Sequence, residues 1–186
     1  MSPNSSYTRR DMRQALLLVV LFATLAFAAR ANADTWHDAL PHAQEVGSGD
    51  FRWYGFSIYS ARLWSERRPF DATAPFALEL TYHRAISRER LVQTSIDEIK
   101  RLYGDSLPSD TLQHWRDDMS QAFRDVSPDD SLIGVFLPSQ GCRFYNQKDW
   151  IADIPDPEFA KAFFSIWLAP RSRDPKLRAQ LLGADQ

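Results

Sequence analysis

The run PFALELTYHR, residues 75–84, places the strongest limit on the fold of this chain. Apolar and polar side chains alternate along it. Because side chains on a β-strand point alternately to the two faces of a sheet, the pattern predicts a half-buried strand. The apolar face of such a strand needs a second layer of structure to cover it. That face consists of Phe76, Leu78, Leu80 and Tyr82, and the polar face consists of Ala77, Glu79, Thr81 and His83.

A second strand is predicted within FRWYGFSIYSARLW, residues 51–64. Its residues alternate from Phe56 onward, but both faces are partly apolar, which indicates an interior strand covered on both sides. One face holds Phe56, Ile58, Ser60, Arg62 and Trp64, and the other holds Ser57, Tyr59, Ala61 and Leu63. The preceding segment GSGD, residues 47–50, is typical of a turn.

The remaining elements fall into separate blocks of helices and strands, which indicates an α+β fold with helices on a mostly antiparallel sheet. Caps, breakers and periodicity set their bounds, and the predicted N-caps are Ser87, Asp156 and Asp174. They are a helix between Ser87 and Gly104, a helix from Ser109, strands at 131–137 and 142–146, an extended piece at 150–154, a helix from Pro157, and a last short helix that ends near Gly183.

The helix PEFAKAFFSIWL, residues 157–168, is apolar nearly all the way round. Such a helix is buried on most sides, or one of its faces lines a pocket.

The first 33 residues predict a secretory signal peptide. Three arginines precede the apolar run ALLLVVLFATLAFAA, and the small-residue pattern Ala31-Asn32-Ala33 predicts cleavage after Ala33. The run is shorter than the roughly 20 residues that span a membrane. An uncleaved anchor and a twin-arginine signal are the alternatives. The sequence therefore predicts a signal peptide at 1–33, one domain at 34–186, and a periplasmic location in a diderm bacterium.

Composition excludes several classes of function. Loss of residues 1–33, which hold four Arg and one Asp, leaves a net charge of −5 without a basic cluster, so nucleic acid is not an expected partner. The single cysteine, Cys142, is expected to be buried. His37, His42 and His114 have no metal-ligand spacing with one another or with Cys142, and no cofactor motif occurs. We expect neither a metal nor a cofactor.

Several stretches in order resemble the chalcone isomerase-like family, in its secreted bacterial branch. They are VGSGDFRWYGFSIYSARLW, PFALELTYHRAISRERLVQTSIDEIKRL, LIGVFLPSQGCRFYNQKDWIADIPDPEFAKAFFSIWLAP and LRAQLLG, and they cover about residues 44–183. The resemblance implies an open-faced β-sandwich, in which helices pack over one face of a large antiparallel sheet and leave a cleft.

The catalytic groups of plant chalcone isomerases are mostly unmatched in this sequence. The position of the family's arginine matches Phe51, with Arg52 one place away. Its tyrosine and asparagine align with Arg88 and Ser95, its strand threonine lies near Tyr59, and its late helix hydroxyl lies near Ser165. We therefore expect no chalcone isomerisation, and the resemblance favours a protein that is not an enzyme.

Other members of this family bind fatty acids, and an arginine and a tyrosine hold the carboxylate. Candidates for such a site are Arg62, Tyr59, Trp64, Tyr82, Phe163 and Trp167. Arg62 could instead form an ion pair with Glu79 of the next strand, the interpretation that we favour, or point into water. The tyrosines could equally be core residues.

Three functions remain open from the sequence. The first is non-catalytic binding of a small apolar or amphipathic, fatty-acid-like ligand. The second is an isomerase or intramolecular lyase with a rearranged cleft. The third is a structural or partner-binding protein whose cleft is filled by its own side chains.

Overall fold

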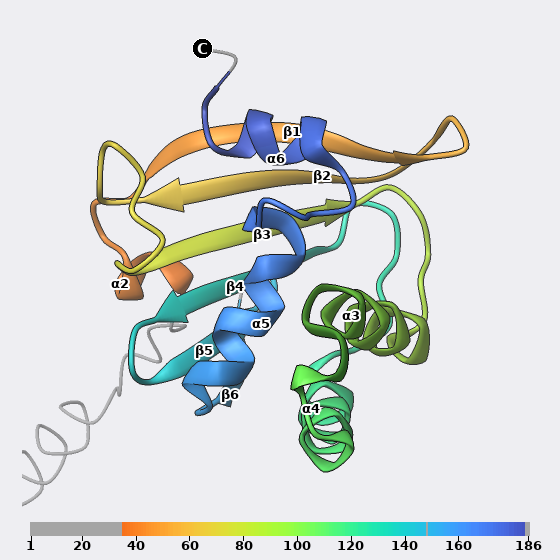
Figure 1. The fold of residues 1–186 in the computed structure, drawn as a ribbon. Coiled ribbons are helices and arrows are strands. Elements are labelled where there is room, and N and C mark those ends of the chain that lie inside the picture. Colours follow the sequence, from red (N-terminus) through yellow and green to blue (C-terminus); the bar gives the residue numbers. More distant parts are fainter. Residues whose placement is uncertain (1–34, 148, 185–186) are drawn as a thin grey trace, which may run out of the picture. The chain divides into compact units, whose positions relative to one another are not determined.

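Six antiparallel strands form one sheet in which spatial order follows chain order (Figure 1). Each strand pairs with the next one along the chain, as expected where short connections join antiparallel neighbours. The strands are β1 (Gln44–Trp53), β2 (Phe56–Ser65), β3 (Phe76–Tyr82), β4 (Ser131–Leu137), β5 (Gly141–Tyr145) and β6 (Trp150–Ile154).

The structure is a computed structural model that describes residues 35–147 and 149–184. All of these residues belong to one compact unit, residues 33–186. The predicted signal peptide, with its cleavage site after Ala33, lies outside the described residues.

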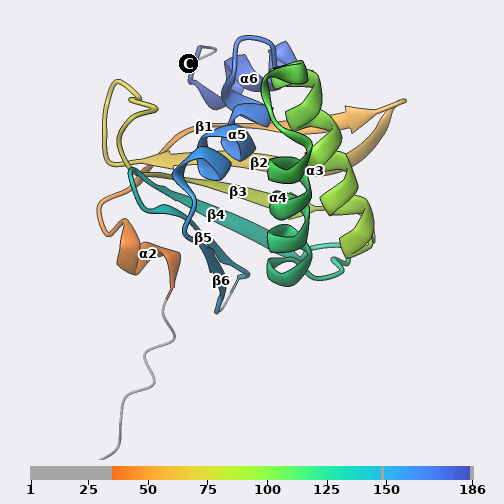
Figure 2. The ribbon, with the colours of Figure 1, turned by 60° about the horizontal axis from the view of Figure 1, so that its bottom comes forward.

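Helices cover one face of the sheet, as the sequence predicted (Figure 2). The long ones are α3 (Arg88–Tyr103), α4 (Ser109–Ala122) and α5 (Pro157–Leu168), and α6 (Pro175–Leu181) packs on β1. A four-residue helix that the sequence did not reveal, α2 (Trp36–Ala39), precedes the sheet. None of the helices in the described ranges is both long enough and apolar enough to span a bilayer.

The helix starts follow the predicted capping residues. The Ser87 hydroxyl accepts a hydrogen bond from the Arg90 backbone N–H at the start of α3. The Asp156 carboxylate accepts hydrogen bonds from two backbone N–H groups at the start of α5. At the start of α6 the Asp174 carboxylate accepts one, from the Leu177 N–H. These side chains satisfy N–H groups that have no partner within the helix, which fixes where each helix begins.

The two faces of β3 contribute to two separate apolar clusters. Its predicted apolar face, Phe76, Leu78, Leu80 and Tyr82, is buried beneath the helices in the larger core. On the opposite face Ala77 packs in a smaller cluster with Trp36 and Leu40 around α2. The alternation therefore identified the main core correctly, while Ala77 is buried as well.

The turn predicted at Gly47-Ser48-Gly49-Asp50 is wrong, because these residues lie inside β1. The glycines serve close packing instead. A Cβ atom on Gly47 would lie 2.0 Å from the backbone carbonyl oxygen of Gln180 in α6. Glycine here lets a helix approach the strand, a role for which glycine in a strand is often used.

Candidate functional site

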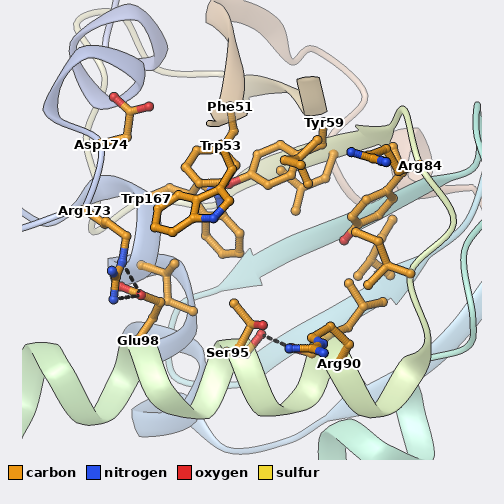
Figure 3. A pocket seen from close by; sticks show the side chains of 18 of the residues that line it. Phe51, Trp53, Tyr59, Arg84, Arg90, Ser95, Glu98, Trp167, Arg173 and Asp174 are labelled. Carbon is orange, nitrogen blue, oxygen red and sulfur yellow. Dashed lines mark hydrogen bonds and ion pairs between the residues drawn. The ribbon is translucent and has the colours of Figure 1, made fainter. Parts of the chain in front are cut away.

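A cavity of about 920 Å³ lies between the sheet and the helices. Strands β1 to β3 form one wall, and α3, α5 and the segment before α6 form the others (Figure 3). Its volume falls within the range of roughly 300–1,000 Å³ that is usual for small-molecule sites. We call this space the sheet–helix cavity.

Most of the wall of the sheet–helix cavity is apolar. The residues come from elements far apart in the sequence, and only the folded sheet brings them together. The main apolar lining residues are Phe51, Trp53, Ile58, Leu80, Ile86, Leu91, Phe123, Leu132, Phe163, Ile166, Trp167 and Leu177.

Two tyrosines, the buried Tyr82 and the partly buried Tyr59, place hydroxyl groups in this apolar setting. The Tyr59 hydroxyl accepts a hydrogen bond of 2.9 Å from the Trp167 indole N–H, so its own proton is left to donate. No hydrogen bond to the Tyr82 hydroxyl occurs among the described residues. Burial raises the pKa of both phenols, and at Tyr59 the Trp167 hydrogen bond acts in the other direction. Both groups therefore stay protonated and act as hydrogen-bond donors.

One end of the sheet–helix cavity carries a closed ion-pair network. Glu98, which is 8% exposed, pairs with Arg101 at 2.8 Å and with Arg173 at 2.5 Å. Figure 3 shows Glu98 and Arg173 facing one another beside Trp167. Because the two arginines already share this carboxylate, Arg173 is a poor anchor for a further anion.

The opposite end of the sheet–helix cavity is cationic. Arg84 and Arg90 both line it and both are exposed (Figure 3). The Arg84 guanidinium lies 5.0 Å from the centre of the Phe56 ring. Neither arginine has an ion-pair partner in the described part of the chain. These two guanidinium groups are thus available to an anionic group at what we call the cationic end.

Four of the six predicted ligand residues meet in the sheet–helix cavity. They are Tyr59, Tyr82, Phe163 and Trp167, contributed by β2, β3 and α5. Helix α5 is buried on most sides and also lines the cavity, so both interpretations of its apolar sequence are correct. Whether these residues bind a ligand stays a prediction.

Arg62 and Trp64, the other two predicted ligand residues, do not line the sheet–helix cavity, because they lie on the other face of β2. Ala61 and Leu63 are fully buried on the helix side, so the alternation turns Arg62 and Trp64 away from the helices. Trp64 packs against Trp36 of α2, with ring centres 5.5 Å apart. The sequence showed two partly apolar faces but not which of them the helices would cover.

The favoured ion pair between Arg62 and Glu79 does not form either. The two residues are direct neighbours in the β2–β3 register. The Glu79 carboxylate instead accepts a hydrogen bond of 3.1 Å from the Trp64 indole, and no ion pair joins Glu79 to Arg62 within the described ranges. Arg62 is an exposed residue, which was the third alternative.

Sequence reasoning missed the two arginines of the cationic end. Helical spacing could have pointed to Arg90. Arg90, Thr94 and Glu98 are four residues apart, which places all three on one side of α3. All three line the cavity. Arg84 carried no such signal, since it follows β3 in a connection whose path a sequence does not reveal.

The positions that match catalytic residues of plant chalcone isomerases separate into two groups. Phe51, Tyr59 and Ser95 line the sheet–helix cavity. Arg88 pairs with Glu89 at the surface and does not line it, and Ser165 borders a different, smaller pocket. Within the described ranges, no three His, Cys, Asp or Glu residues cluster closely enough to hold a metal ion.

Comparison with known proteins identifies the relatives of this chain. The sequence profile of the chalcone isomerase-like family matches residues 51–183. A protein of uncharacterised function from Haemophilus influenzae is 34% identical over 152 residues, which cover 80% of this chain and 73% of that protein. A fatty-acid binding protein from Arabidopsis thaliana has a similar fold, with a TM-score of 0.59 and 9% identity over 77% of this chain and 88% of that one.

Proposed function

The chain belongs to the chalcone isomerase-like family, and on that premise we propose that it binds an amphiphile with a long apolar tail and an anionic head, such as a fatty acid. The observation that carries the proposal is the sheet–helix cavity, which combines a mostly apolar wall with one cationic end. Ligand sites typically pair apolar walls with a few placed polar groups. The fatty-acid binding protein of similar fold supports the same class of ligand.

The charges of the site suggest how the ligand lies. Arg84 and Arg90 meet the head group, because a guanidinium donates two parallel hydrogen bonds to a carboxylate. The tail extends between β2 and α5 toward Phe163 and Trp167. The far end offers the head group no equivalent place, since Glu98 is acidic and already holds Arg173.

We propose that binding takes place without catalysis. Tyr59 and Tyr82 are titratable groups in the apolar part of the cavity wall, and burial raises the pKa of each phenol. Neither is suited to remove a proton near neutral pH. Both can donate a hydrogen bond to a polar atom of the ligand.

The double variant Arg84→Gln/Arg90→Gln is expected to bind palmitate at least about ten-fold more weakly, since a hydrogen bond to a charged group contributes roughly 1.5–3 kcal/mol. Binding would be measured by displacement of a fluorescent fatty acid. The affinity for 1-hexadecanol, which has the same tail without the carboxylate, should change much less.

Arg88→Gln is the matched control for that experiment. Arg88 lies two residues before Arg90 but pairs with Glu89 and does not line the cavity. It should bind palmitate like the parent protein. Equal palmitate affinity in the double variant and the parent, or no saturable binding by the parent, would refute the proposed site.

We also propose that the protein is exported and acts in the periplasm. The exported protein should begin at Asp34, because the apolar run and Ala31-Asn32-Ala33 precede it. N-terminal sequencing of the protein from a periplasmic extract checks this, and a retained Met1 would contradict it.

A further inference from the structure

The turn between β1 and β2 presents three large aromatic side chains to solvent. Trp53 is 48% exposed, Tyr54 is 87% exposed and Phe56 is 61% exposed. We call residues 53–56, Trp-Tyr-Gly-Phe, the hairpin tip. In both views the hairpin tip projects beyond α3 and beyond the ends of the neighbouring strands (Figures 1 and 2).

Folding does not explain an aromatic residue at Tyr54. Tyr54 and Gly55 are the two central residues of the turn, with φ angles of 48° and 82°. A two-residue turn with both φ values positive favours Asn-Gly and strains a bulky residue at the first position. Tyr54 therefore gains little from burial and has an unfavourable backbone conformation. Residues held in this way tend to serve a function.

Cationic groups flank the hairpin tip. Arg52 precedes it, and Arg84 lies over the Phe56 ring. Neither side chain has an ion-pair partner among the residues that the structure describes. The acidic residue closest in sequence, Asp50, accepts a hydrogen bond from Ser60. The tip is thus locally positive on a chain whose net charge is negative.

We propose that the hairpin tip docks on the surface of an anionic lipid bilayer. Trp and Tyr favour the interface between water and lipid, and arginines next to them attract anionic head groups. A projecting two-residue turn offers too little area for a stable protein interface, which takes about 800 Å² from each partner. Side chains that enter the head-group region need no matching surface.

The hairpin tip also joins the sheet–helix cavity. Trp53 belongs to both, and Arg84, which lies over the Phe56 ring of the tip, stands at the cationic end of the cavity. Docking by the tip would therefore bring the cationic end of the cavity to the lipid surface. This link between tip and cavity rests on the proposed function, because only a cavity that binds an amphiphile would have a ligand to exchange with the bilayer.

The test uses the chain from Asp34 onward, which contains every residue that the structure describes and both apolar clusters. Co-sedimentation with vesicles of phosphatidylcholine and phosphatidylglycerol should pellet this protein, and vesicles of phosphatidylcholine alone should bind it more weakly. Tyr54→Asn/Phe56→Thr should reduce binding to the mixed vesicles by about ten-fold or more. Asn-Gly suits the turn, so this variant should keep its thermal midpoint.

Three further variants, two of them controls, separate the tip from general surface effects. Trp150→Thr removes another half-exposed aromatic residue, on β6, and should bind vesicles like the parent. Arg52→Gln should weaken binding to the anionic vesicles by about five-fold, as roughly 1 kcal/mol per arginine implies. Lys161→Gln removes an exposed cation on α5, far from the tip in sequence, and should leave binding to the anionic vesicles unchanged.

The inference is overturned if the parent protein stays in the supernatant with both kinds of vesicle. It is also overturned if the tip binds a protein partner instead of lipid. Equal pelleting of the parent and Tyr54→Asn/Phe56→Thr overturns it too. Palmitate binding measured without vesicles keeps the two proposals apart. A protein that binds vesicles through the tip but does not bind palmitate refutes only the proposed function, and the reverse result refutes only the docking.

Discussion

Replacement of Trp115 by alanine should lower the free energy of unfolding by about 3–5 kcal/mol, the usual cost of removing a buried tryptophan. Trp115 is 2% exposed and packs edge-on against Phe159, with ring centres 5.8 Å apart. Its indole N–H also donates a 2.8 Å hydrogen bond to Asp156, the residue that caps α5. The side chain thus joins α4 to the start of the helix that lines the cavity. Urea unfolding followed by circular dichroism measures the loss.

Trp150→Ala is the matched control for this substitution. The Trp150 indole N–H also donates a 2.8 Å hydrogen bond to an aspartate, Asp153, but the side chain is 49% exposed. The two tryptophans therefore differ mainly in burial. The change at Trp150 should cost within about 1 kcal/mol, as most surface substitutions do. Similar losses at both positions would show that packing around Trp115 is not what stabilises this part of the fold.

Gly47→Ala should destabilise the protein by about 3 kcal/mol, near the upper end for overpacking. The added Cβ would lie 2.0 Å from the Gln180 carbonyl oxygen and 2.9 Å from that of Leu181. Both contacts are with backbone atoms, so a side-chain rotation cannot relieve them. Helix α6 would have to move away from β1. Urea unfolding would report the loss as a lower midpoint.

Gly49→Ala tests whether the backbone contact is the cause. A Cβ there would lie 2.3 Å from the side-chain amide oxygen of Gln180 and 3.0 Å from a methyl group of Leu177. The amide is the end of a flexible side chain and can swing aside. A cost below about 1 kcal/mol is expected. A tolerant Gly47 together with a sensitive Gly49 would contradict the packing argument.

The local structure of this protein follows closely from its sequence. Ser87 and Asp156 cap helices where predicted, and the alternation in β3 marks the face that the helices bury. These signals are local, because a cap satisfies N–H groups within one turn and alternation repeats every two residues. Several ordered motifs also identified the family, whose profile matches residues 51–183.

The errors arose where a residue's role depends on a distant segment. Gly47 was interpreted as part of a turn. Its small size instead allows close packing of α6, which lies more than 120 positions later in the chain. Arg62 was a candidate ligand residue, although the helices cover the opposite face of β2. A strand with two partly apolar faces does not reveal which face a helix will cover, because that choice depends on packing between elements.

The sequence by itself therefore determined most of the elements, though not β1 or α2, together with the helix caps, the buried face of β3 and the family. Only the tertiary structure decided which side chains share the sheet–helix cavity. It brought Arg84 and Arg90 to one end and paired Arg173 with Glu98 at the other. The physical reason is distance along the chain. Hydrophobic periodicity acts within one element, whereas a cavity is made by side chains from several elements whose positions are fixed only when the helices pack on the sheet.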